Sequence, residues 1–399
     1  MSFFSGLDFF ITLIIAIIPA IILGINGKSL RYYRGVLTCV FIYLIYRNSL
    51  MELAFMLEYS AMSLGLVKLY MLSRTKVGRN KFFYVLAVII TLCPLILSKL
   101  ESFVGHGFFG SGNTIFGFLG LSYIFFRVIQ IIIEIYDGII NEIKWSEFLE
   151  FLLFFPTLSS GPIDRSRRFS QDCYKIYTGK EYSELLSNGI VKIMWGLLYK
   201  LPLSGTAMYI MNTYMINKYD PIHIIGYAYS YGLYMFFDFA GYSLMAVGTG
   251  YILGIKVPDN FNKPFISIDI KDFWDRWHIT LSHWFRDFIF SRFLFNSLSK
   301  KRFKNKLTAA SAGLMINMTL MGIWHGLELH YIAYGVYHGI LLVIAELYQK
   351  KSRFYKLHKR DKVYKIVSWF ITLNLVMFGF LIFSGQGRAA AIGLIEYLR

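Results

Sequence analysis

Long apolar segments recur along this chain and restrict its possible folds more than any other feature. Only 16% of its 399 residues are charged, whereas a soluble protein carries about 25%. Because a helix satisfies its own backbone hydrogen bonds in lipid, apolar runs of about 20 residues indicate membrane-spanning helices. The candidate spans are 7–25, 34–47, 52–72, 82–100, 114–136, 185–212, 222–254, 308–326, 331–348 and 363–384. The sequence predicts an all-α polytopic membrane protein, one domain over residues 1–399 with about 10–11 transmembrane helices.

Two segments predict structures that do not simply cross the membrane. The run 148–159 is too short for a span and leads into Ser-Ser-Gly-Pro, so we expect it to enter the membrane and return. The run 222–254 is too long for one straight span, and Phe-Asp-Phe-Ala-Gly-Tyr-Ser at 237–243 interrupts it. A kinked or broken helix is expected there, and non-helical backbone at that depth is tolerated only inside protein or beside water.

The formal net charge of +17 is concentrated in loops between the candidate spans. Lysine and arginine cluster at 28–34, 74–81, 300–306 and 350–362. The connections 101–113 and 327–330 are nearly free of them. Positively charged loops stay in the cytoplasm, so the four clusters are expected there and the N-terminus outside. Anionic lipids or an acidic cytoplasmic partner fit these clusters, whereas nucleic acid does not, because membrane spans separate them.

An unusual cluster of aromatic and ionisable residues occupies 272–287. It reads Asp-Phe-Trp-Asp-Arg-Trp-His-Ile-Thr-Leu-Ser-His-Trp-Phe-Arg-Asp. As one continuous helix it would have an aromatic face formed by Trp274, Trp277, His278, Leu281, Trp284, Phe285 and Phe288. The other face would carry Asp272, Asp275, Arg276, Thr280, His283, Arg286 and Asp287. In lipid these charges would have no water or partner, so we expect a helix at a membrane boundary or along a water-filled cavity. His278 is the titratable group of its aromatic face.

Other polar residues lie inside apolar segments. A second isolated histidine, His325, ends such a segment within Met-Gly-Ile-Trp-His-Gly at 321–326. Asp238 is costly inside its apolar run, so it is either functional or the partner of a cation such as Arg127. Arg127 and Glu134 share a helix face and are expected to pair with each other. The remaining histidines in apolar or interfacial surroundings are expected to be structural: His223, His283, His330 and His338.

Proton transfer is the chemistry that suits two buried histidines. A neutral imidazole can take a proton from a hydroxyl as that hydroxyl attacks an acyl carbon, at neutral pH. The sequence has no Gly-x-Ser-x-Gly elbow, no His-Glu-x-x-His pair and no phosphate-binding glycine loop. Its three cysteines lack metal-ligand spacing, so no metal is expected. Direct acyl transfer is therefore favoured, while a membrane transporter or a scaffold would explain the spans equally well.

Several motifs together carry a resemblance to a known family. The stretch from Tyr231 to Asp287 includes Phe-Phe-Asp-Phe-Ala-Gly-Tyr-Ser and Asn-Phe-Asn-Lys-Pro-Phe, and ends in the 272–287 cluster. With Met-Gly-Ile-Trp-His-Gly at 321–326 and Ser-Gly-Pro-Ile-Asp-Arg at 160–165, it resembles the membrane-bound O-acyltransferase family. This resemblance implies spanning, re-entrant and interfacial helices around a central tunnel, with a catalytic core over about 114–348.

Within that family the chain most resembles the D-alanyl transferases of teichoic acid D-alanylation. The alternative is an O-acetyltransferase of the alginate type, which acts on polysaccharides. Those enzymes are usually longer and carry an acidic residue where this chain has Leu244. They also follow Arg-Asp with Pro-Leu-Gly-Gly, whereas residues 286–287 here lead into Phe-Ile-Phe-Ser-Arg-Phe-Leu-Phe-Asn.

The resemblance implies specific roles for residues and partners. His325 would be the general base, and His278 the second catalytic position. The donor would be a D-alanyl thioester on the phosphopantetheine arm of an acidic cytoplasmic carrier protein, so no cofactor is expected to be bound permanently. The acceptor would be an outer-face hydroxyl of teichoic or lipoteichoic acid, or of a relay protein, at the plasma membrane of a Gram-positive bacterium. We expect tunnel-lining or substrate-positioning roles for Asp238, Trp274, Arg276, Trp277, Ser282, Arg286 and Trp324.

The segment after the cluster is a candidate docking site for the acidic carrier. It combines apolar residues with a basic run: Phe290, Phe293, Leu294 and Phe295, followed by Lys300, Lys301, Arg302, Lys304 and Lys306. A carrier helix with a small apolar patch and carboxylates would complement it. The alternative is an interfacial helix that these phenylalanines and lysines anchor in lipid.

Overall fold

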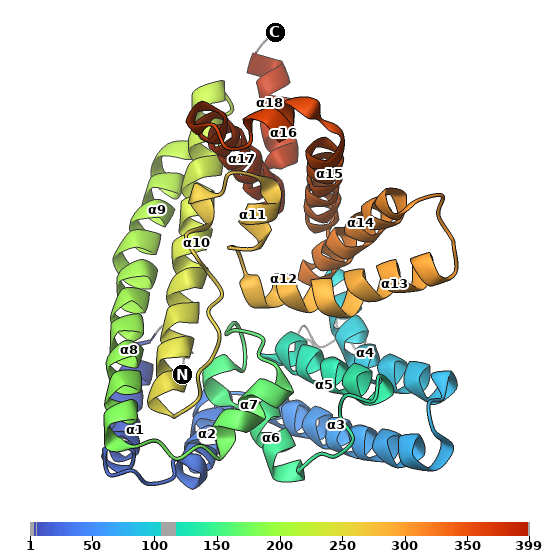
Figure 1. The fold of residues 1–399 in the computed structure, drawn as a ribbon. Helices are drawn as coiled ribbons and strands as arrows, with labels where there is room; N and C mark the ends of the chain where they lie inside the picture. The colour runs from blue at the N-terminus through green and yellow to red at the C-terminus, as the bar shows by residue number, and fades with distance from the viewer. Residues whose placement is uncertain (1–3, 5, 105–116, 398–399) are drawn as a thin grey trace. The chain divides into compact units, whose positions relative to one another are not determined.

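The computed structural model describes residues 4, 6–104 and 117–397, in which all regular secondary structure is helical (Figure 1). The chain forms two compact units: residues 1–197 with 241–259, and residues 198–240 with 260–399. The single domain predicted over 1–399 and the central tunnel remain predictions. Residues 105–113 of the predicted lysine-poor loop and 114–116 of the predicted fifth span lie outside the described residues.

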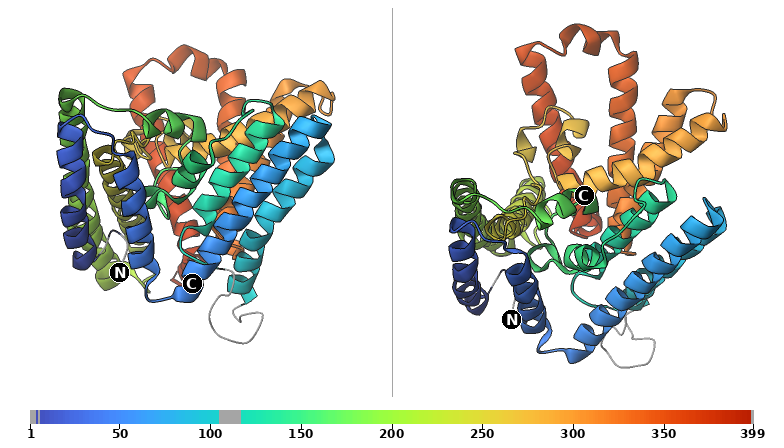
Figure 2. Two further views of the ribbon diagram at one scale, coloured as in Figure 1. Left: turned by 90° about the horizontal axis from the view of Figure 1, so that it is seen from below. Right: turned by 60° about the horizontal axis from the view of Figure 1, so that its bottom comes forward.

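The first unit contains most of the N-terminal half of the chain. Its elements are α1 (Leu7–Ile25), α2 (Arg31–Tyr46), α3 (Leu50–Val77), α4 (Lys81–Val104), α5 (Leu121–Tyr136), α6 (Trp145–Leu153), the 3₁₀ turn η1 (Phe155–Thr157), α7 (Ser166–Cys173), nearly all of α8 (Gly179–Leu198), and α10 from Gly241 on. Helices α3 and α4 run side by side (Figure 2). Ser49 caps α3 by accepting the Glu52 N–H at 3.4 Å, and Gly78, at φ +78°, ends it.

Helix α5 forms the core of this unit, because 14 of its 16 residues are buried. The predicted pairing of Arg127 with Glu134 is wrong. The Arg127 guanidinium instead donates to the carbonyls of Phe151 at 2.9 Å and Leu152 at 2.8 Å, and to both oxygens of Thr157. These carbonyls lie at the C-terminal end of α6 and in η1, where the helix supplies no donor. Glu134 faces Arg167 at 3.7 Å.

The predicted re-entrant run coincides with α6 and η1. Helix α6 has nine residues, too few to span a bilayer, and the chain leaves it at Phe154, which has φ −50° and ψ 104°. Arg127 replaces the missing hydrogen bonds of this reversal, so a buried arginine holds the backbone together there. The membrane depth of the segment remains a prediction.

The second unit contains the C-terminal half of the chain. Its elements are the π-helical turn η2 (Tyr199–Leu203), α9 (Ser204–Ile210), the π-helical turn η3 (Met211–Met215), α10 (Pro221–Ile252) as far as Ala240, η4 (Pro264–Ile266), α11 (Ile270–Trp274), α12 (Ile279–Phe285), the π-helical turn η5 (Arg286–Phe290), α13 (Ser291–Ser299), α14 (Lys306–His325), α15 (Leu329–Lys351), α16 (Arg353–His358), α17 (Lys362–Phe383) and α18 (Gly387–Tyr397).

Helix α10 is continuous over 32 residues, so a break at 237–243 is wrong, while a kink there remains a prediction. The polar groups of that run are satisfied without unwinding the helix. Asp238 accepts from Lys200 at 2.6 Å, and the Tyr242 hydroxyl lies 2.5 Å from that of Ser159. The irregular backbone lies in the preceding segment instead, where Pro202 sits inside η2 and cannot donate a backbone hydrogen bond.

Six of the predicted spans coincide with helices that are long and apolar enough to cross a membrane. They are α1, α3, α4, α14, α15 and α17. The other four coincide with α2, with α5, with the path from α8 to η3, and with α10. An all-α, multi-pass membrane protein is therefore confirmed, while the number of crossings remains a prediction.

Candidate active site

The two histidines singled out by the sequence both lie in the second unit. His325 is the last residue of α14, and His278 directly precedes α12. The single helix predicted over 272–287 is wrong, because α11 ends at Trp274 and α12 begins at Ile279. His278 between them is left-handed, with φ 43° and ψ 51°. The Ile279 N–H donates to the Asn260 carbonyl at 2.9 Å, a contact outside the helix that periodicity could not predict.

Despite the break, most of the predicted aromatic face is buried. Trp274, Trp277 and His278 are buried, as the aromatic face predicted. Thr280, predicted on the charged face, is only 7% exposed, and its hydroxyl donates to Asn260 Oδ1 at 2.6 Å. The aromatic face predicted for this stretch is otherwise confirmed in α12, because Leu281, Trp284 and Phe285 are also buried.

His278 occupies an aromatic and nearly dry environment. It is 4% exposed, with the ring of Phe239 edge-on at 4.6 Å and the ring of Trp324 at 6.4 Å. Within the described part of the chain its Nε2 has no hydrogen-bond partner. Burial, with a further contribution from the charge of His325, holds the pKa of His278 well below its ordinary value. The imidazole is therefore neutral at pH 7.

His325 lies in a second aromatic environment at the end of α14. Ring centroids of Trp324, Phe383 and Tyr331 lie 4.6, 5.0 and 6.2 Å from its imidazole. Unlike His278, it is not fully buried. The C-terminus of a helix stabilises positive charge, so a proton on this imidazole would be stabilised there.

The crossing of α14 and α15 fixes the position of His325. A Cβ on Gly322 would lie 2.4 Å from the Tyr331 carbonyl oxygen, and one on Gly335 would lie 2.5 Å from that of Met318. Only glycine permits this approach, so the two glycines set the spacing of the helices. Gly322 lies one turn before His325, so the packing of α15 against α14 fixes the backbone close to the histidine.

The other predicted site residues occupy different surroundings. Arg276 pairs with Asp272 at 2.6 Å and donates to the Asn262 carbonyl at 3.3 Å. Ser282 donates from its hydroxyl to the Trp277 carbonyl at 3.2 Å. Arg286 is half-exposed beside Asp287 at 3.3 Å. Trp324 flanks His325, and Asp238 pairs with Lys200 rather than Arg127.

A cavity of about 360 Å³ lies beside the histidine turn, between α11, α12, α13, α14 and α15. Four cationic side chains line it: Lys271, Arg286, Lys306 and Lys350. Trp274 and Ser282, which also belong to the predicted site, line it as well. Lys271 donates to Gln349 at 2.9 Å and also to Glu346, which ties α11 to α15. Phe290 and Leu294 of the predicted docking segment line this cavity too, whereas Phe295 is 76% exposed.

Sequence reasoning missed Asn317, which lines the same cavity. It is 7% exposed, and its Oδ1 has no partner among the residues that the structure describes. The Trp274 Nε1 is likewise buried without a partner in that part of the chain. A lone amide about two turns before His325 on an apolar helix was the available signal. Both residues line the cavity, and both of these polar atoms are buried.

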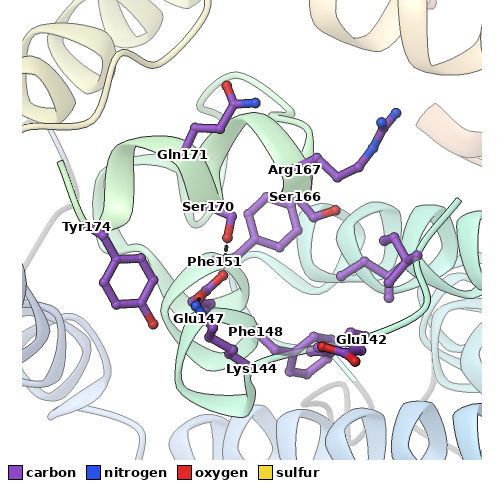
Figure 3. Close-up of a pocket in the computed structure, with 13 residues that line it drawn as sticks. Glu142, Lys144, Glu147, Phe148, Phe151, Ser166, Arg167, Ser170, Gln171 and Tyr174 are labelled. Atoms are coloured by element: carbon purple, nitrogen blue, oxygen red, sulfur yellow. Dashed lines mark hydrogen bonds and ion pairs between the residues drawn. The ribbon is translucent and has the colours of Figure 1, made fainter.

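A second cavity, of about 480 Å³, lies in the first unit (Figure 3). There the Ser170 hydroxyl donates to Glu147, and the rings of Phe148 and Phe151 form an apolar wall. It shares no residue with the histidine centre and contains none of the predicted site residues.

The comparison with known families decides the class of this chain. Residues 127–385 match the model of the membrane-bound O-acyltransferase family. The chain belongs to this family. The matched range contains both histidines and all the residues that line the cavity of about 360 Å³. This membrane-bound O-acyltransferase is therefore an enzyme that transfers acyl groups, as the sequence motifs indicated.

Individual relatives agree with the branch predicted from the sequence. The chain is 42% identical to the teichoic acid D-alanyltransferase of Bacillus subtilis (strain 168), over 97% of this chain and 98% of that protein. It is 37% identical to the teichoic acid D-alanyltransferase of Streptococcus thermophilus, over 94% of this chain and 93% of that protein. A probable alginate O-acetylase of Pseudomonas aeruginosa is 30% identical, over 81% of this chain but 61% of that protein.

Proposed function

We propose that this acyltransferase moves D-alanine from a carrier-protein thioester to a hydroxyl of teichoic acid, or of a protein that relays the alanine to it. The observation that carries the proposal is that the Trp324 ring lies 6.4 Å from the imidazole of His278 and 4.6 Å from that of His325, so histidines from different elements share one aromatic centre. The two teichoic acid D-alanyltransferases, similar over nearly their whole lengths, support D-alanine as the acyl group.

His325 acts as the general base in the proposed reaction. It takes the proton of the acceptor hydroxyl while the hydroxyl oxygen attacks the thioester carbonyl carbon. The carbon–sulfur bond then breaks, an ester forms, and the departing thiolate takes the proton back from the imidazolium. His278 stays neutral and orients the donor, because its buried Nε2, which has no partner among the residues that the structure describes, is available to hydrogen-bond the substrate. Excluding water from this centre prevents hydrolysis of the thioester.

The cavity beside the histidine turn suits a phosphopantetheine arm. Lys306 and Lys350 can bind the phosphate at its rim, and the apolar wall accommodates the hydrocarbon part of the arm. Asn317 Oδ1 can accept from an amide N–H of the arm, and Trp274 Nε1 can donate to an amide carbonyl. The carrier protein supplies the arm, so the enzyme needs no permanently bound cofactor.

The carrier is proposed to dock on α13 and the basic run that follows it. Phe295 offers an exposed apolar anchor, and the exposed Lys300, Lys301 and Arg302 complement an acidic partner. Phe293 is less suited to the docking role, since its ring packs against Phe303 at 6.1 Å. Phe295→Asp should abolish carrier binding, while single lysine changes should weaken it modestly and mainly at low salt. Normal binding of Phe295→Asp in detergent would place the docking site elsewhere.

The proposed orientation follows from the basic loops. The clusters at 28–34, 74–81, 300–306 and 350–362 face the cytoplasm and anionic lipids, and the N-terminus lies outside. The carrier then approaches from the cytoplasm and the acceptor from the outer face of a Gram-positive plasma membrane. Cysteine accessibility on the two sides of intact cells tests this orientation.

Transfer from a loaded carrier in reconstituted vesicles tests the proposed function. The enzyme is supplied with D-alanyl carrier and, separately, with acetyl carrier, and the acceptor is placed inside or outside the vesicles. D-alanyl ester formation is expected, and preferential acetyl transfer would support the alginate-type alternative. Movement of an acceptor across the membrane without ester formation would support a transporter. Transfer activity in His325→Ala would show that His325 is not the general base.

A further inference from the structure

A short segment from another part of the second unit encloses the histidine turn. The Asn262 N–H donates to the Arg276 carbonyl at 3.0 Å, and the Ile279 N–H donates to the Asn260 carbonyl at 2.9 Å. These two main-chain bonds lie on either side of His278. The Asn-Phe-Asn run at 260–262 therefore clamps the backbone before and after the histidine.

The clamped residue has a backbone conformation that non-glycine residues seldom adopt. His278, at φ 43° and ψ 51°, is left-handed, and such a conformation persists only where surrounding contacts hold it. The residues on either side favour a continuous helix, as their 3.6-residue periodicity indicates. The local sequence therefore does not explain the turn, whereas the clamp does.

The Asn260 side chain replaces the cap that His278 does not provide. His278 occupies the N-cap position of α12, where a side-chain oxygen normally accepts a backbone N–H of the first turn. Its imidazole makes no such bond. Instead Asn260 Oδ1 accepts the Thr280 N–H at 3.3 Å and the Thr280 hydroxyl at 2.6 Å. Because the Thr280 N–H is a donor, the Asn260 side chain must turn its Oδ1, and not its Nδ2, toward Thr280.

We propose that Asn260 is a positioning residue for acyl transfer. It caps α12 from outside the helix, holds His278 in the left-handed turn and so leaves the imidazole free for the reaction. Asn260 is 1% exposed, which keeps water from competing for these bonds. The Phe239 ring, edge-on at 4.6 Å, restrains the imidazole from another element. This inference rests on the role of His278 in the proposed function.

A matched pair of substitutions at Thr280 tests the clamp with little change in volume. Thr280→Val removes the hydroxyl that donates to Asn260, whereas Thr280→Ser keeps it. Misplacing His278 should lower kcat for D-alanyl transfer by at least about 10-fold in Thr280→Val and in Asn260→Ala, with KM for the loaded carrier unchanged. The kcat of Thr280→Ser should stay within about twofold of the wild-type kcat. Rates are expressed per folded enzyme, measured by thermal unfolding and gel filtration in detergent.

The pH profile gives a readout that a purely structural asparagine would not affect. Asn260→Asp keeps both acceptor positions but places a carboxylate beside the turn. A nearby negative charge favours the imidazolium, so the acidic limb of the rate–pH profile should move to higher pH. The titratable neighbour that already acts on His278 is His325 of α14. An unshifted profile with an active Asn260→Asp enzyme would contradict the coupling.

Parallel assays of His278→Ala and His325→Ala separate this inference from the function it rests on. If those variants keep wild-type activity, the proposed catalytic centre is wrong. If they lose activity while folded Asn260→Ala and Thr280→Val keep wild-type kcat, only the positioning role fails. Should Asn260→Ala not fold, the Thr280→Val and Thr280→Ser pair decides, and equal kcat in the two would overturn the proposal.

Discussion

Two groups of buried polar side chains in this protein differ in the partners that they find. In the first unit Arg127 and Arg34 are each 1% exposed, and both guanidinium groups donate to several acceptors. In the second unit the histidine turn and its cavity bury His278 Nε2, Trp274 Nε1 and Asn317 Oδ1. These three atoms have no hydrogen-bond partner within residues 4, 6–104 and 117–397.

The difference separates polar residues that stabilise the fold from those available to substrates. An unsatisfied buried polar group costs about 1–3 kcal/mol, and a substrate that supplied partners to the three atoms beside the histidine turn would recover that cost. Substitutions in the first region should therefore lower stability and leave kcat of the folded enzyme unchanged. Removing only the unpaired polar atoms of the second should lower kcat without lowering stability at pH 7.

His325→Ala should have the largest effect in the second region. Removing a general base costs about 10²–10⁴-fold in rate, while the partly exposed ring contributes little to folding. The transfer rate is measured with purified enzyme, and stability is measured by thermal unfolding of the same sample. His330→Ala, on the neighbouring helix, is the control and should keep its activity. If a folded His325→Ala enzyme still transferred D-alanine at a substantial rate, His325 would not be the general base.

Arg127→Met should have the largest effect in the first region. It leaves the carbonyls of Phe151, Leu152 and Thr157 without their donor, at a cost of about 3 kcal/mol or more. The measurement is the urea or thermal unfolding of the enzyme in detergent. Arg167→Met is the matched control, because the Arg167 side chain is 62% exposed and its pairing contributes about 0–1 kcal/mol. Equal stability of the two variants would contradict the capping role of Arg127.

Gly322→Ala should affect both stability and activity, because it acts on the helix that carries His325. The new Cβ would lie 2.4 Å from the Tyr331 carbonyl oxygen, so α14 and α15 must separate, at about 1–3 kcal/mol. The shift should also lower kcat by misplacing the histidine. Gly65→Ala in α3 is the control, since nothing lies within 4 Å of its Cβ position. Unchanged kcat in a folded Gly322→Ala enzyme would show that the spacing does not position His325.

The sequence predicted those parts of the molecule that depend on local pattern. Apolar runs located the helices, because lipid selects composition over about 20 residues. Contacts between distant segments decided the rest. The pairing of Arg127 with Glu134 followed a local rule, but the unsatisfied carbonyls of α6 attract the guanidinium. Likewise, the break at His278 depends on Asn260, and periodicity within 272–287 could not reveal it.

The neutral state of His278 predicts a pH dependence of stability. Its pKa is lowered in the folded protein by burial and by the charge of His325, so below about pH 6.5 the unfolded chain binds a proton that the folded chain does not. Stability is therefore fully present above that pH and declines as the pH falls toward the folded pKa. His278→Asn should flatten this decline by up to about 1.4 kcal/mol per pH unit. Identical curves for the two proteins between pH 7 and 5 would contradict the buried, neutral imidazole.

Asp238→Asn should have the smallest effect and decides to which region Asp238 belongs. Its side chain is 40% exposed and pairs at 2.6 Å with Lys200, which is 15% exposed. A partly exposed pair of this kind contributes about 0–1 kcal/mol, because water screens the charges. Stability should therefore fall slightly, and a double-mutant cycle with Lys200→Gln should return a coupling energy of about that size. A loss of D-alanyl transfer beyond about 10-fold at unchanged stability would instead assign Asp238 to the substrate path.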